Sequence, residues 1–442
     1  MALSGLDIYK LLPKTNCREC GFATCLAFAM QLAKKTVAIE KCPHLKEEEK
    51  KVLEESSLPP IKLVSVGEGD SKISIGNETV LFRHEEKFYN PCGVGFIIED
   101  DSSDSEIQAK IEKIKELKFE RIGQELNANL IAIKQNGDAK RFLEVVKLVS
   151  GNCKLALVLI SDDLGALKGA LDLTKDKKPL IYHATKDNLS QIAQLAKDYK
   201  VPLVVTDADL ESLANLSAEL NKQGLSDLIL DTGRKSIAGR IWDLTQIRRQ
   251  ALKKSNRTLG YPVLVMIDEQ DPFEEAMEAA SYIAKYAGII LIKSIESWQT
   301  LSLLTLRQNI YTDPQKPLQI EPKLYSVGQV SDKSPVLVTT NFSLTYYTVL
   351  GEVEASKVPA YIVSIDTEGM SVLTGWAAEK FTPEKISESI NKFALNDAVS
   401  HKRLVIPGYV AVMSGELEDK SSWQVVVGPK EASGIPSFLK NL

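Results

Sequence analysis

Short apolar runs recur along the middle of the chain, and helix-like stretches follow most of them. Such runs predict buried strands, and apolar residues three or four positions apart predict helices that bury one face. The strand-like runs cover residues 94–98, 130–133, 155–160, 180–183, 203–206, 228–231, 263–267 and 288–292. Helices are expected, among others, at 107–117, 189–197, 210–220 and 273–287. Eight strand–helix units in about 250 residues predict a closed (β/α)8 barrel, the TIM barrel architecture.

An open doubly wound sheet is the alternative architecture for this middle block. Gly93 and Gly95 are not followed by the third glycine of a dinucleotide-binding fingerprint. Eight consecutive strands without that fingerprint favour closure into a barrel. Residues 79–84 alternate between polar and apolar positions, so we expect an extra hairpin there, at the floor of the barrel.

The last quarter of the chain again alternates strand-like and helix-like segments. We expect strands at 335–340, 360–365, 403–406 and 424–427, and helices at 345–356, 372–381, 383–393 and 437–442. This order predicts a small α/β sheet of the flavodoxin-like type. Ligands of such open parallel sheets bind beyond the carboxyl ends of the strands.

Two segments divide the chain into modules. Residues 46–60 form a charged run that ends in Ser-Ser-Leu-Pro-Pro, and residues 313–335 carry four prolines without a clear periodicity. Such segments are typical of domain boundaries. The sequence therefore predicts an α/β multidomain protein with a small N-terminal module at 1–57, a barrel at 58–312, a linker at 313–335 and a flavodoxin-like domain at 336–442.

Charge and composition narrow the class of partner. The 442 residues carry a net charge of −5, and basic residues occur at most in scattered pairs such as Arg248-Arg249. This argues against nucleic acid as a partner, because nucleic acid requires a basic surface. No apolar run approaches the roughly 18 residues that a membrane-crossing helix needs, and residues 1–14 lack the zones of a signal peptide. We expect no membrane contact and a cytoplasmic protein.

Four of the six cysteines lie within the first 42 residues, with the spacing C-x2-C-x4-C-x16-C-P. They are Cys17, Cys20, Cys25 and Cys42. Such crowding in a reducing compartment indicates a metal site. Three thiolates from one tight loop can hold three corners of an iron–sulfur cluster, and a distant fourth closes it. A structural zinc site is the alternative, but zinc sites usually show two close pairs, and one is present here. Cys92 and Cys153 stand singly beside predicted strands and are expected to be small buried hydrophobes.

Acidic residues end several strands of the predicted barrel, at the face where barrel active sites form. They are Glu99, Asp100, Asp162, Asp207, Asp231 and Asp268. Helix capping is the simpler interpretation for Asp162, Asp163 and Asp207, and for Asp271 before Pro272. Among the four histidines, His183 stands at a strand end, where a satisfied structural role is the simpler interpretation. Without a Walker loop, nucleophile elbow or zinc-protease motif, the barrel alone does not indicate an enzyme.

Loops after the four tail strands are rich in glycine and small hydroxyl residues. They cover residues 339–346, 367–375, 407–409 and 428–434, and include Asn341, Thr374, Gly408, Tyr409 and Gly428. Glycines allow the backbone to approach a large flat ligand, whose apolar face Met370, Val372 and Leu373 would cover. Ordinary turn chemistry, with Ser343 and Ser371 as N-caps, is the alternative.

The cysteine spacing, followed by a barrel and a flavodoxin-like tail, resembles the large-subunit family of the corrinoid iron–sulfur protein. That family carries methyl groups in the anaerobic acetyl-CoA (Wood–Ljungdahl) pathway. The resemblance covers essentially the full length and implies a 4Fe-4S cluster on the four cysteines of the motif, a corrinoid bound by the tail domain, and a small barrel subunit with which the chain forms a heterodimer. The corrinoid contacts that it implies are Thr340, Tyr346, Met370, Ser371, Val372, Leu373 and Ala432.

Many corrinoid modules carry Asp-x-His-x-x-Gly, whose histidine binds cobalt from below. None of the four histidines here stands in that motif. The resemblance therefore implies a cobalamin-type corrinoid that is bound base-off, without a protein imidazole on cobalt. Because a strong lower ligand stabilises Co(II), its absence eases reduction to cob(I).

The resemblance also implies a methyl shuttle without catalytic residues of its own. Cob(I) accepts a methyl group from methyltetrahydrofolate on a separate methyltransferase. Methyl-Co(III) then donates it to the nickel site of acetyl-CoA synthase/carbon monoxide dehydrogenase. The cluster returns oxidised Co(II) to cob(I), and a reductive activator is a further expected partner. The cofactor supplies the chemistry, and the protein controls ligation and access.

Two other functions compete with the carrier interpretation. The chain could be an electron-transfer subunit whose tail is a docking domain. Alternatively, it could be a barrel methyltransferase that binds a pterin at its own face through Asp207 or Asp231.

Overall fold

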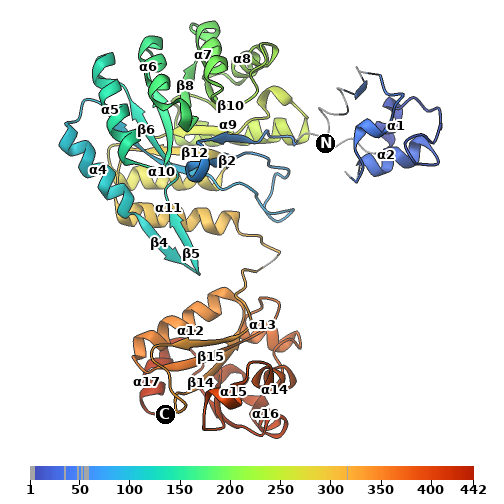
Figure 1. Cartoon of the computed structure of the whole chain (residues 1–442), viewed down its shortest axis with the longest axis vertical. Helices are drawn as coiled ribbons and strands as arrows, with labels where there is room; N and C mark the ends of the chain where they lie inside the picture. The colour runs from blue at the N-terminus through green and yellow to red at the C-terminus, as the bar shows by residue number, and fades with distance from the viewer. Residues whose placement is uncertain (1–4, 34–35, 47–48, 51–52, 54–58, 316) are drawn as a thin grey trace. The chain divides into compact units, whose positions relative to one another are not determined.

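The computed structural model describes residues 5–33, 36–46, 49–50, 53, 59–315 and 317–442 (Figure 1). Much of the segment expected at 46–60 lies outside these residues. The chain falls into two compact units, one of residues 1–119 and 126–311, the other of residues 120–125 and 312–442. None of the helices in the described part of the chain is long and apolar enough to cross a membrane.

A small helical module contains the cysteine motif. Helices α1 (Gly5–Leu11) and α2 (Cys25–Ala33) pack together, and a 3-10 turn, η1 (Ile39–Lys41), follows them. Ile8, Phe28 and Ala29 are buried in the core of this module. The short hydrophobic core is sufficient to order the loop between the two helices, where the cysteines stand.

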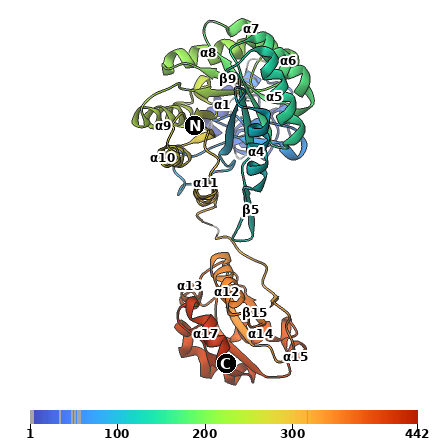
Figure 2. The ribbon, with the colours of Figure 1, turned by 90° about the vertical axis from the view of Figure 1, so that its left-hand side faces the viewer.

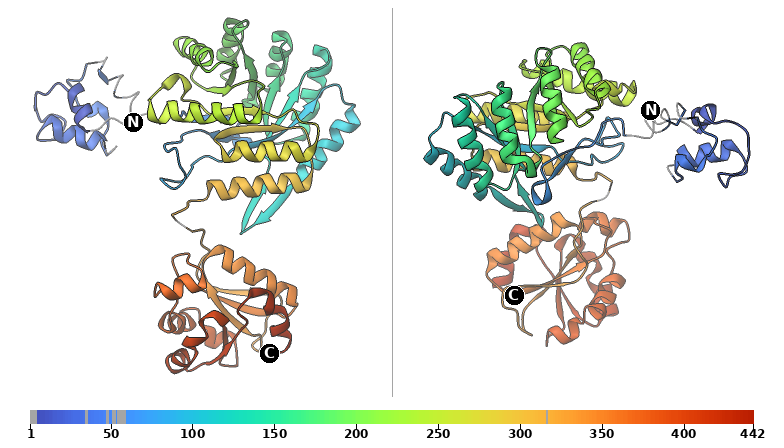
Figure 3. Two further views of the ribbon diagram at one scale, coloured as in Figure 1. Left: turned by 180° about the vertical axis from the view of Figure 1, so that it is seen from behind. Right: turned by 45° about the horizontal axis from the view of Figure 1, so that its top comes forward.

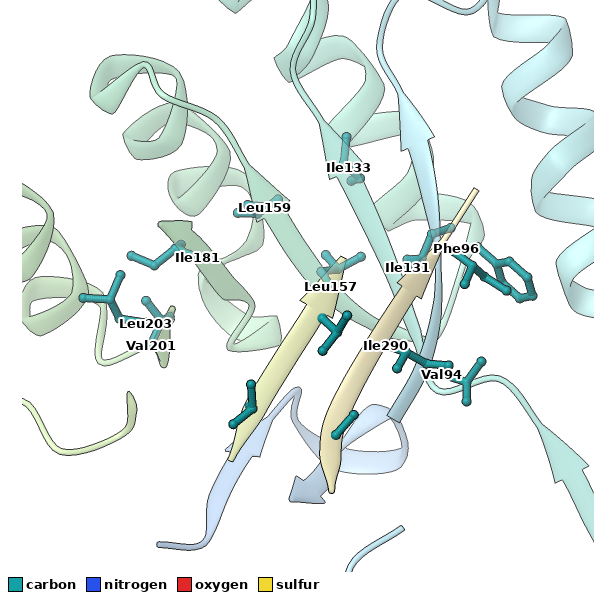
Figure 4. Packing of buried hydrophobic residues seen from close by; sticks show 14 of the residues in the cluster. Val94, Phe96, Ile131, Ile133, Leu157, Leu159, Ile181, Val201, Leu203 and Ile290 are labelled. Carbon is teal, nitrogen blue, oxygen red and sulfur yellow. The ribbon is translucent and has the colours of Figure 1, made fainter. Parts of the chain in front are cut away.

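Eight parallel strands close into a barrel, as the sequence pattern predicts. The strands are β3 (Gly93–Glu99), β6 (Leu130–Lys134), β7 (Ala156–Ile160), β8 (Leu180–Ala184), β9 (Leu203–Thr206), β10 (Leu228–Asp231), β11 (Val263–Met266) and β12 (Ala287–Ile292). The ring closes where β12 pairs with β3, with Ile290 opposite Val94. Residues that point outward from the strands form one hydrophobic core with the helices, as Figure 4 shows for Val94, Ile131 and Leu157.

Eight helices surround the strands (Figure 2). They are α4 (Asp104–Glu116), α5 (Ala139–Asn152), α6 (Leu164–Thr174), α7 (Leu189–Tyr199), α8 (Leu210–Lys222), α9 (Ile237–Lys253), α10 (Pro272–Ala284) and α11 (Ser297–Tyr311). Helix α10 ends three residues before the predicted end, because Ala287 already pairs with Val263 as the first residue of β12. A hairpin that the pattern did not predict, β4 (Lys118–Arg121) and β5 (Gln124–Asn127), lies between α4 and β6 in the sequence.

The floor of the barrel carries a hairpin, but not at the predicted residues. Strands β1 (Val64–Val66) and β2 (Ile73–Ile75) form it, and their apolar residues join the core inside the barrel. Residues 79–84 contain no strand. Their carbonyls instead accept hydrogen bonds from side chains: Val80 O binds Arg248 Nη2 at 2.6 Å, and Leu81 O binds Tyr286 Oη at 2.9 Å. The alternation there was wrongly interpreted as a strand signal.

The tail is a five-stranded sheet with helices on both faces (Figure 3). Its strands are β13 (Leu324–Val327), β14 (Val336–Thr340), β15 (Ala360–Ile365), β16 (Arg403–Ile406) and β17 (Gln424–Val427), in the order β13-β15-β14-β16-β17. Helices α12 (Ser343–Ser356) and α17 (Ile435–Lys440) cover one face, and α14 (Pro383–Lys392) and α16 (Ser414–Ser421) cover the other. The four parallel strands follow the flavodoxin-like order 2-1-3-4, which confirms the predicted type.

Two details of the tail differ from the prediction. Strand β13, which pairs antiparallel with β15, lies inside the range expected to be a linker. It is a short, half-buried edge strand, so its periodicity is weak. Helix α13 (Val372–Ala377) ends four residues before the predicted 381, because the backbone N–H groups of Lys380 and Phe381 both turn back to the carbonyl of Gly375.

Candidate functional site

The loop between α1 and α2 positions the first two cysteines of the motif. Asn16, Arg18 and Gly21 adopt left-handed backbone conformations, with φ of 48°, 68° and 85°. The side chain of Asn16 accepts a hydrogen bond from the N–H of Cys25 at 2.8 Å, which ties the loop to the start of α2. These bends fold the loop back on itself, so that Cys17 and Cys20 stand beside the helix that begins with Cys25.

The four thiols are close to one another. Burial is the main cause that raises the pKa of the Cys42 thiol, and a hydrogen bond from the backbone of His44 opposes it. The charges of Cys20, Cys25 and Cys17 raise the pKa of Cys42 further, so all three sulfurs lie within electrostatic reach. The structure thus brings together the four cysteines that the spacing singled out.

The spacing of the sulfurs distinguishes between the two kinds of metal site. A tetrahedral zinc ion with bonds of about 2.3 Å would hold its four sulfurs roughly 3.8 Å apart. Among the described residues, the group of metal-binding atoms that lie within 4.8 Å of one another is Cys17 with Glu19 and His44, and not a set of three cysteines. The described cysteines are thus not set at the spacing of a preformed zinc site, and the C-x2-C-x4-C-x16-C-P spacing is compatible with a cluster. His44 Nε2 lies 3.1 Å from Glu19 Oε2, so these two side chains also bond to each other.

The tail contains a cavity of about 250 Å³ at the carboxyl ends of its parallel strands. It lies at β14 and β16, the two neighbouring strands between which the strand order reverses. Ligands of open α/β sheets bind at this switch point. The lining is mainly apolar, with hydroxyls and one cation, and consists of Leu337, Val338, Thr339, Leu344, Thr345, Thr348, Val349, Val372, Val405, Ile406, Pro407, Tyr409, Gly428, Pro429, Lys430, Ala432 and Ile435.

Three buried hydroxyls near this end of the sheet have no hydrogen-bond partner. They belong to Thr339, Thr340 and Ser364, and Thr339 pairs with Ser364 across β14 and β15. Because buried polar groups are nearly always hydrogen-bonded, such groups indicate that a bound molecule completes them. Thr339 lines the cavity, and Thr340 points to the opposite face because side chains alternate along a strand.

Glycines let the loops after β16 and β17 meet backbone to backbone. A Cβ on Gly408 would lie 2.6 Å from the carbonyl oxygen of Gly428 and 2.8 Å from the nitrogen of Lys430. A Cβ on Gly428 would lie 3.0 Å from the carbonyl oxygen of Ile406. Both positions therefore require glycine. The contact between the two loops forms part of the cavity wall, which Gly428 lines.

The structure separates the predicted corrinoid contacts into three groups. Val372, Tyr409, Gly428 and Ala432 line the cavity, and Gly408 supports it. Met370, Ser371, Leu373 and Thr374 lie partly or fully exposed around the start of α13, beside it. Asn341 and Tyr346 are buried: Asn341 Oδ1 accepts the N–H groups of Thr367 and Gly369, and Tyr346 packs on Tyr325 at 4.7 Å between ring centres. Asn341 thus holds the loops in place, and Tyr346 belongs to the core.

The structure agrees only in part with the alternative that the tail loops show ordinary turn chemistry. Phe342, not Ser343, stands at the N-cap of α12, so that assignment was wrong. Ser371 does stand at the N-cap of α13, but its hydroxyl contacts Thr374 Oγ1 at 3.0 Å and caps no backbone N–H. The sequence analysis included Thr339 and Thr345 in the candidate loop 339–346 without naming them as contacts, and it missed Thr348. The signal was available, since Thr345 and Thr348 are three residues apart and therefore share a face of α12.

The acidic residues of the barrel have several different roles. Asp163 and Asp271 cap α6 and α10, as expected. Asp162 and Asp207 do not cap a helix; Asp209 caps α8, and Asp207 accepts the N–H of Asp209 at 2.8 Å. The expectation of capping was wrong for these two, because in each case the cap stands further along the loop.

The buried groups of the barrel include one histidine and two thiols. His183 is not satisfied, since its Nδ1 is buried without a partner, and burial lowers its pKa. This corrects the expectation of a satisfied structural histidine. Burial raises the pKa of Cys92 to about 12 and also raises that of Cys153. Both thiols stay protonated near neutral pH and pack as small hydrophobes.

Comparisons with known proteins agree with this architecture. A family model described as the CO dehydrogenase/acetyl-CoA synthase delta subunit matches residues 63–439, and an Fe-S cluster family matches residues 12–44. The corrinoid/iron-sulfur protein large subunit of Moorella thermoacetica is 44% identical over 441 residues, which cover 100% of this chain and 99% of that protein. The chain belongs to the corrinoid/iron-sulfur protein large-subunit family.

Other members of this family carry a different name. The acetyl-CoA decarbonylase/synthase complex subunit gamma of Methanothermobacter thermautotrophicus is 37% identical over 456 residues, which cover 100% of this chain and 99% of that protein. Among solved structures, a dihydropteroate synthase from Coxiella burnetii matches with a TM-score of 0.39 and 12% identity, covering 50% of this chain and 94% of that one. The barrel assignment rests on the strand pairing described above.

Proposed function

We propose that this protein is the large subunit of a corrinoid iron–sulfur methyl carrier of the acetyl-CoA pathway. The observation that carries the proposal is one chain that combines a four-cysteine site with a glycine-walled cavity at the switch point of a flavodoxin-like sheet. Family membership over the full length supports the same function. The proposed modules are a cluster domain at 1–57, a barrel at 58–312, a linker at 313–335 and a corrinoid domain at 336–442.

The cysteine site fits a 4Fe-4S cluster, with Cys17, Cys20, Cys25 and Cys42 as its ligands. The thiols of Cys17, Cys20 and Cys25 lie within electrostatic reach of Cys42, and the loop backbone is bent to present them. When bound, the cluster supplies single electrons, and the corrinoid supplies a cobalt centre that takes up a methyl group from methyltetrahydrofolate and releases it to acetyl-CoA synthase. The chain holds both groups and controls access to them.

The tail cavity fits part of a corrinoid rather than the whole of it. Gly408 and Gly428 bring two loops into backbone contact, Thr339 offers an unfilled hydroxyl, and the apolar wall covers a hydrophobic face. The cavity measures about 250 Å³, so a flat ring system would also be held by the partly or fully exposed residues at the start of α13 beside it. Those residues are Met370, Ser371, Leu373 and Thr374. A partner then covers the remaining side.

The tail supports a base-off corrinoid without a histidine on cobalt. Its single histidine, His401, precedes β16 and therefore lies at the amino ends of the parallel strands, opposite to the cavity. Its Nε2 contacts the carbonyl of Ser334 at 2.9 Å. No imidazole of the tail thus reaches the switch point.

An apolar face on the barrel is the proposed contact for the small partner subunit. Phe273 and Met277 on α10 and Trp298 and Leu301 on α11 are exposed, and the rings of Phe273 and Trp298 stack at 4.4 Å. The charged residue of α11, Arg307, is buried, so the outer side of that helix carries no charge. Exposed aromatics and depleted charge are typical of the centre of an interface.

The rim of this face indicates which partner covers it. Glu269, Asp271 and Glu274 are exposed at the start of α10. A second copy of this chain would bring the same acidic rim, whereas a different subunit can bring basic residues. We therefore assign the face to the small subunit of the heterodimer. The methyltransferase, acetyl-CoA synthase/carbon monoxide dehydrogenase and a reductive activator are proposed as further, transient partners.

The test is co-production of the chain with its small partner in the presence of cobalamin, followed by metal analysis and absorbance spectra before and after a low-potential reductant. We expect iron, sulfide and corrinoid together, with a shift to the cob(I) spectrum on reduction. Cys25→Ser should lose iron and keep corrinoid, and Cys153→Ser, a buried thiol outside the motif, should keep both. A cluster spectrum without corrinoid under these conditions would overturn the carrier function in favour of an electron-transfer subunit.

The assignment of the apolar face is tested separately by co-purification. Met277→Glu should abolish recovery of the small subunit, because a charge would be buried at the centre of the interface. Leu173→Glu is the matched control, since Leu173 is 48% exposed on α6 and lies outside the face. Equal recovery with both variants would contradict the assignment.

A further inference from the structure

The carboxyl ends of the barrel strands enclose a second cavity, which the proposed methyl-carrier function does not use. It has a volume of about 140 Å³. Its lining comes from six of the eight strands or the residues that follow them, and from Arg240 on α9. Residues at this face of (β/α)8 barrels form binding and active sites, whereas the opposite face serves stability.

Charged and polar side chains are buried at the bottom of this cavity. Tyr182 Oη donates a hydrogen bond to Asp231 Oδ2 at 2.7 Å, and the N–H of Gly233 donates to Asp231 Oδ1 at 2.9 Å. Arg240 donates to the carbonyl of Gly233 at 2.8 Å and contacts Glu278 at 3.3 Å. The side chain of Arg240 is 5% exposed, and its Nε is buried without a partner. A buried cation with an unfilled N–H thus lines the cavity.

The upper wall adds three more cations. Lys134 Nζ donates to Glu99 Oε1 at 3.0 Å, and Lys293 and Arg234 both contact Asp268. An ammonium group has three N–H donors, and each of these lysines uses one of them in a contact that the structure shows. The carboxylates hold the cations in place but do not use all of their N–H donors.

Counting donors and acceptors identifies the kind of ligand. Both oxygens of Asp231 already accept a hydrogen bond, and Asp268 already holds two cations. Arg240 Nε is a buried donor that lacks an acceptor. Lys134 and Lys293, whose side chains are 29% and 27% exposed, each keep N–H groups beyond the one used in the contact shown. Four of the lining residues are cations and two are carboxylates, so positive charge is in excess among them. The cavity therefore requires a molecule that is rich in acceptors and negatively charged.

We propose that the barrel mouth is a binding site for a small oxyanion, such as a phosphate, a carbonate or the carboxylate of a short organic acid. Its oxygens receive donors of Arg240, Lys134 and Lys293, and Arg234, which also lines the cavity, adds positive charge beside them. The cavity volume of about 140 Å³ limits the enclosed part of the ligand to a small molecule or group. The site depends on neither the cluster nor the corrinoid.

A purely structural role does not account for this cavity. The interior of a (β/α)8 barrel is ordinarily filled by layers of branched apolar side chains, as it is below this level. Placing ionisable groups beside an unfilled space costs stability, and filling the space with apolar residues would avoid that cost. The arrangement is explained when the space receives a ligand.

The test uses the full chain and three named probes: inorganic phosphate, bicarbonate and acetate. Binding is followed by isothermal titration calorimetry and by ³¹P or ¹³C NMR relaxation of the probe, at constant ionic strength. We expect saturable binding of at least one probe, and the probe that binds identifies the source of the oxyanion. Lys293→Gln and Arg234→Gln should weaken it by about tenfold, a change of about 1.4 kcal/mol.

Lys186→Gln is the matched control, because Lys186 is exposed in the loop after β8 and does not line the cavity. It should bind the probe as the unaltered protein does. The side chain of Arg234 is 78% exposed, so its replacement keeps the protein folded even where that of Lys293 does not. No saturable binding of any of the three probes, or unaltered binding in the Arg234→Gln variant, would overturn the proposal.

Discussion

The barrel and the tail each place a cavity at the carboxyl ends of parallel strands, yet the two cavities are lined in opposite ways. The barrel mouth is lined by ion pairs: Lys293 and Arg234 contact Asp268, and Arg240 is buried below them. The tail cavity is walled by apolar side chains and glycine backbone, and its polar groups are hydroxyls such as Thr339.

With the two proposed ligands, one rule of topology would serve two kinds of molecule. Parallel strands bring their following loops to one edge in both sheets. The barrel surrounds that edge on all sides, which suits a small charged molecule that must lose its water. The open sheet exposes the edge, which suits a broad molecule that rests on loops and is covered from outside. The nature of the lining, rather than the fold, then determines the chemistry.

The largest effect is expected from a substitution that disrupts the tail cavity and leaves the barrel cavity intact. In Gly408→Ala the new Cβ would lie 2.6 Å from the carbonyl oxygen of Gly428, so the loops after β16 and β17 must separate. We expect corrinoid affinity to fall by tenfold or more, that is by about 1.4 kcal/mol or more, because the glycine-walled floor is displaced. Corrinoid content per chain after cobalamin loading measures the effect.

Gly415→Ala provides the control for this substitution. Gly415 lies in α16 of the same domain, and a Cβ there meets no atom within 4 Å. This variant should bind corrinoid normally, and both variants should bind the oxyanion probe at the barrel mouth as before. Normal corrinoid content in Gly408→Ala would show that the wall of the cavity is not part of the site.

A smaller effect is expected from Thr339→Val, which removes the unfilled hydroxyl and keeps the shape of the side chain. In the corrinoid-free protein no hydrogen bond is lost, so the free energy of unfolding should stay equal or rise. With corrinoid bound, we expect a loss of about 1 kcal/mol in binding free energy, the usual contribution of one hydrogen bond. Denaturation and corrinoid titration measure the two quantities.

The matched control for that change is Thr348→Val, in the same cavity. The hydroxyl of Thr348 already donates to the carbonyl of Leu344 at 2.7 Å. Its removal should leave corrinoid affinity unchanged. A Thr339→Val variant that unfolds more easily without corrinoid, and binds it normally, would show that the hydroxyl serves the fold.

The sequence was sufficient for the eight barrel strands, for the four parallel strands of the tail and for the grouping of the four cysteines, and the physical reason is that these signals are local. Parallel strands buried on both faces are continuous apolar runs, and ligands on one loop keep a fixed spacing. The cavities depend on packing between distant segments. Thr339 is one hydroxyl inside a strand, and Arg240 is one charge on a helix. Neither reveals from sequence that it faces an unfilled space.

The hairpin at the floor of the barrel shows the same limit of prediction from local sequence. The alternation at 79–84 was locally convincing, but Arg248 and Tyr286, about two hundred residues away in the chain, take up the carbonyls that a strand would have used. Strands β1 and β2 form the hairpin instead because Val64, Val66 and Ile75 fit the interior of the barrel. Long-range hydrogen bonding thus overrode the local pattern.

A still smaller effect is expected in the pH dependence of the free energy of unfolding, to which Asp231 at the barrel mouth contributes. Burial is the main cause that raises the pKa of Asp231, and the hydrogen bonds from Tyr182 and Gly233 only partly offset it. Between the ordinary carboxyl pKa of 3.8 and the raised native value, the folded protein keeps a proton that the unfolded chain has lost. The free energy of unfolding therefore falls as pH rises through this window.

Asp231→Asn should remove that fall, because an amide does not titrate. Each unit by which the native pKa exceeds the unfolded one contributes about 1.4 kcal/mol. Denaturant titrations across the window, in the absence of oxyanions, measure the slope. Asp187→Asn, an exposed carboxylate on the same face of the barrel, should keep the original slope. A persistent slope in Asp231→Asn would assign it to another group.

For the last substitution we expect no effect. This result distinguishes a corrinoid at the carboxyl ends of the tail strands from one at their amino ends. His401 lies at the amino ends of the parallel strands and contacts the carbonyl of Ser334, so it cannot reach a ligand at the carboxyl ends. His401→Ala should leave the electron paramagnetic resonance spectrum of the Co(II) form unchanged, without nitrogen splitting from a protein imidazole. Nitrogen splitting that disappears in this variant would place the corrinoid at the opposite edge of the sheet and contradict the base-off assignment without a histidine.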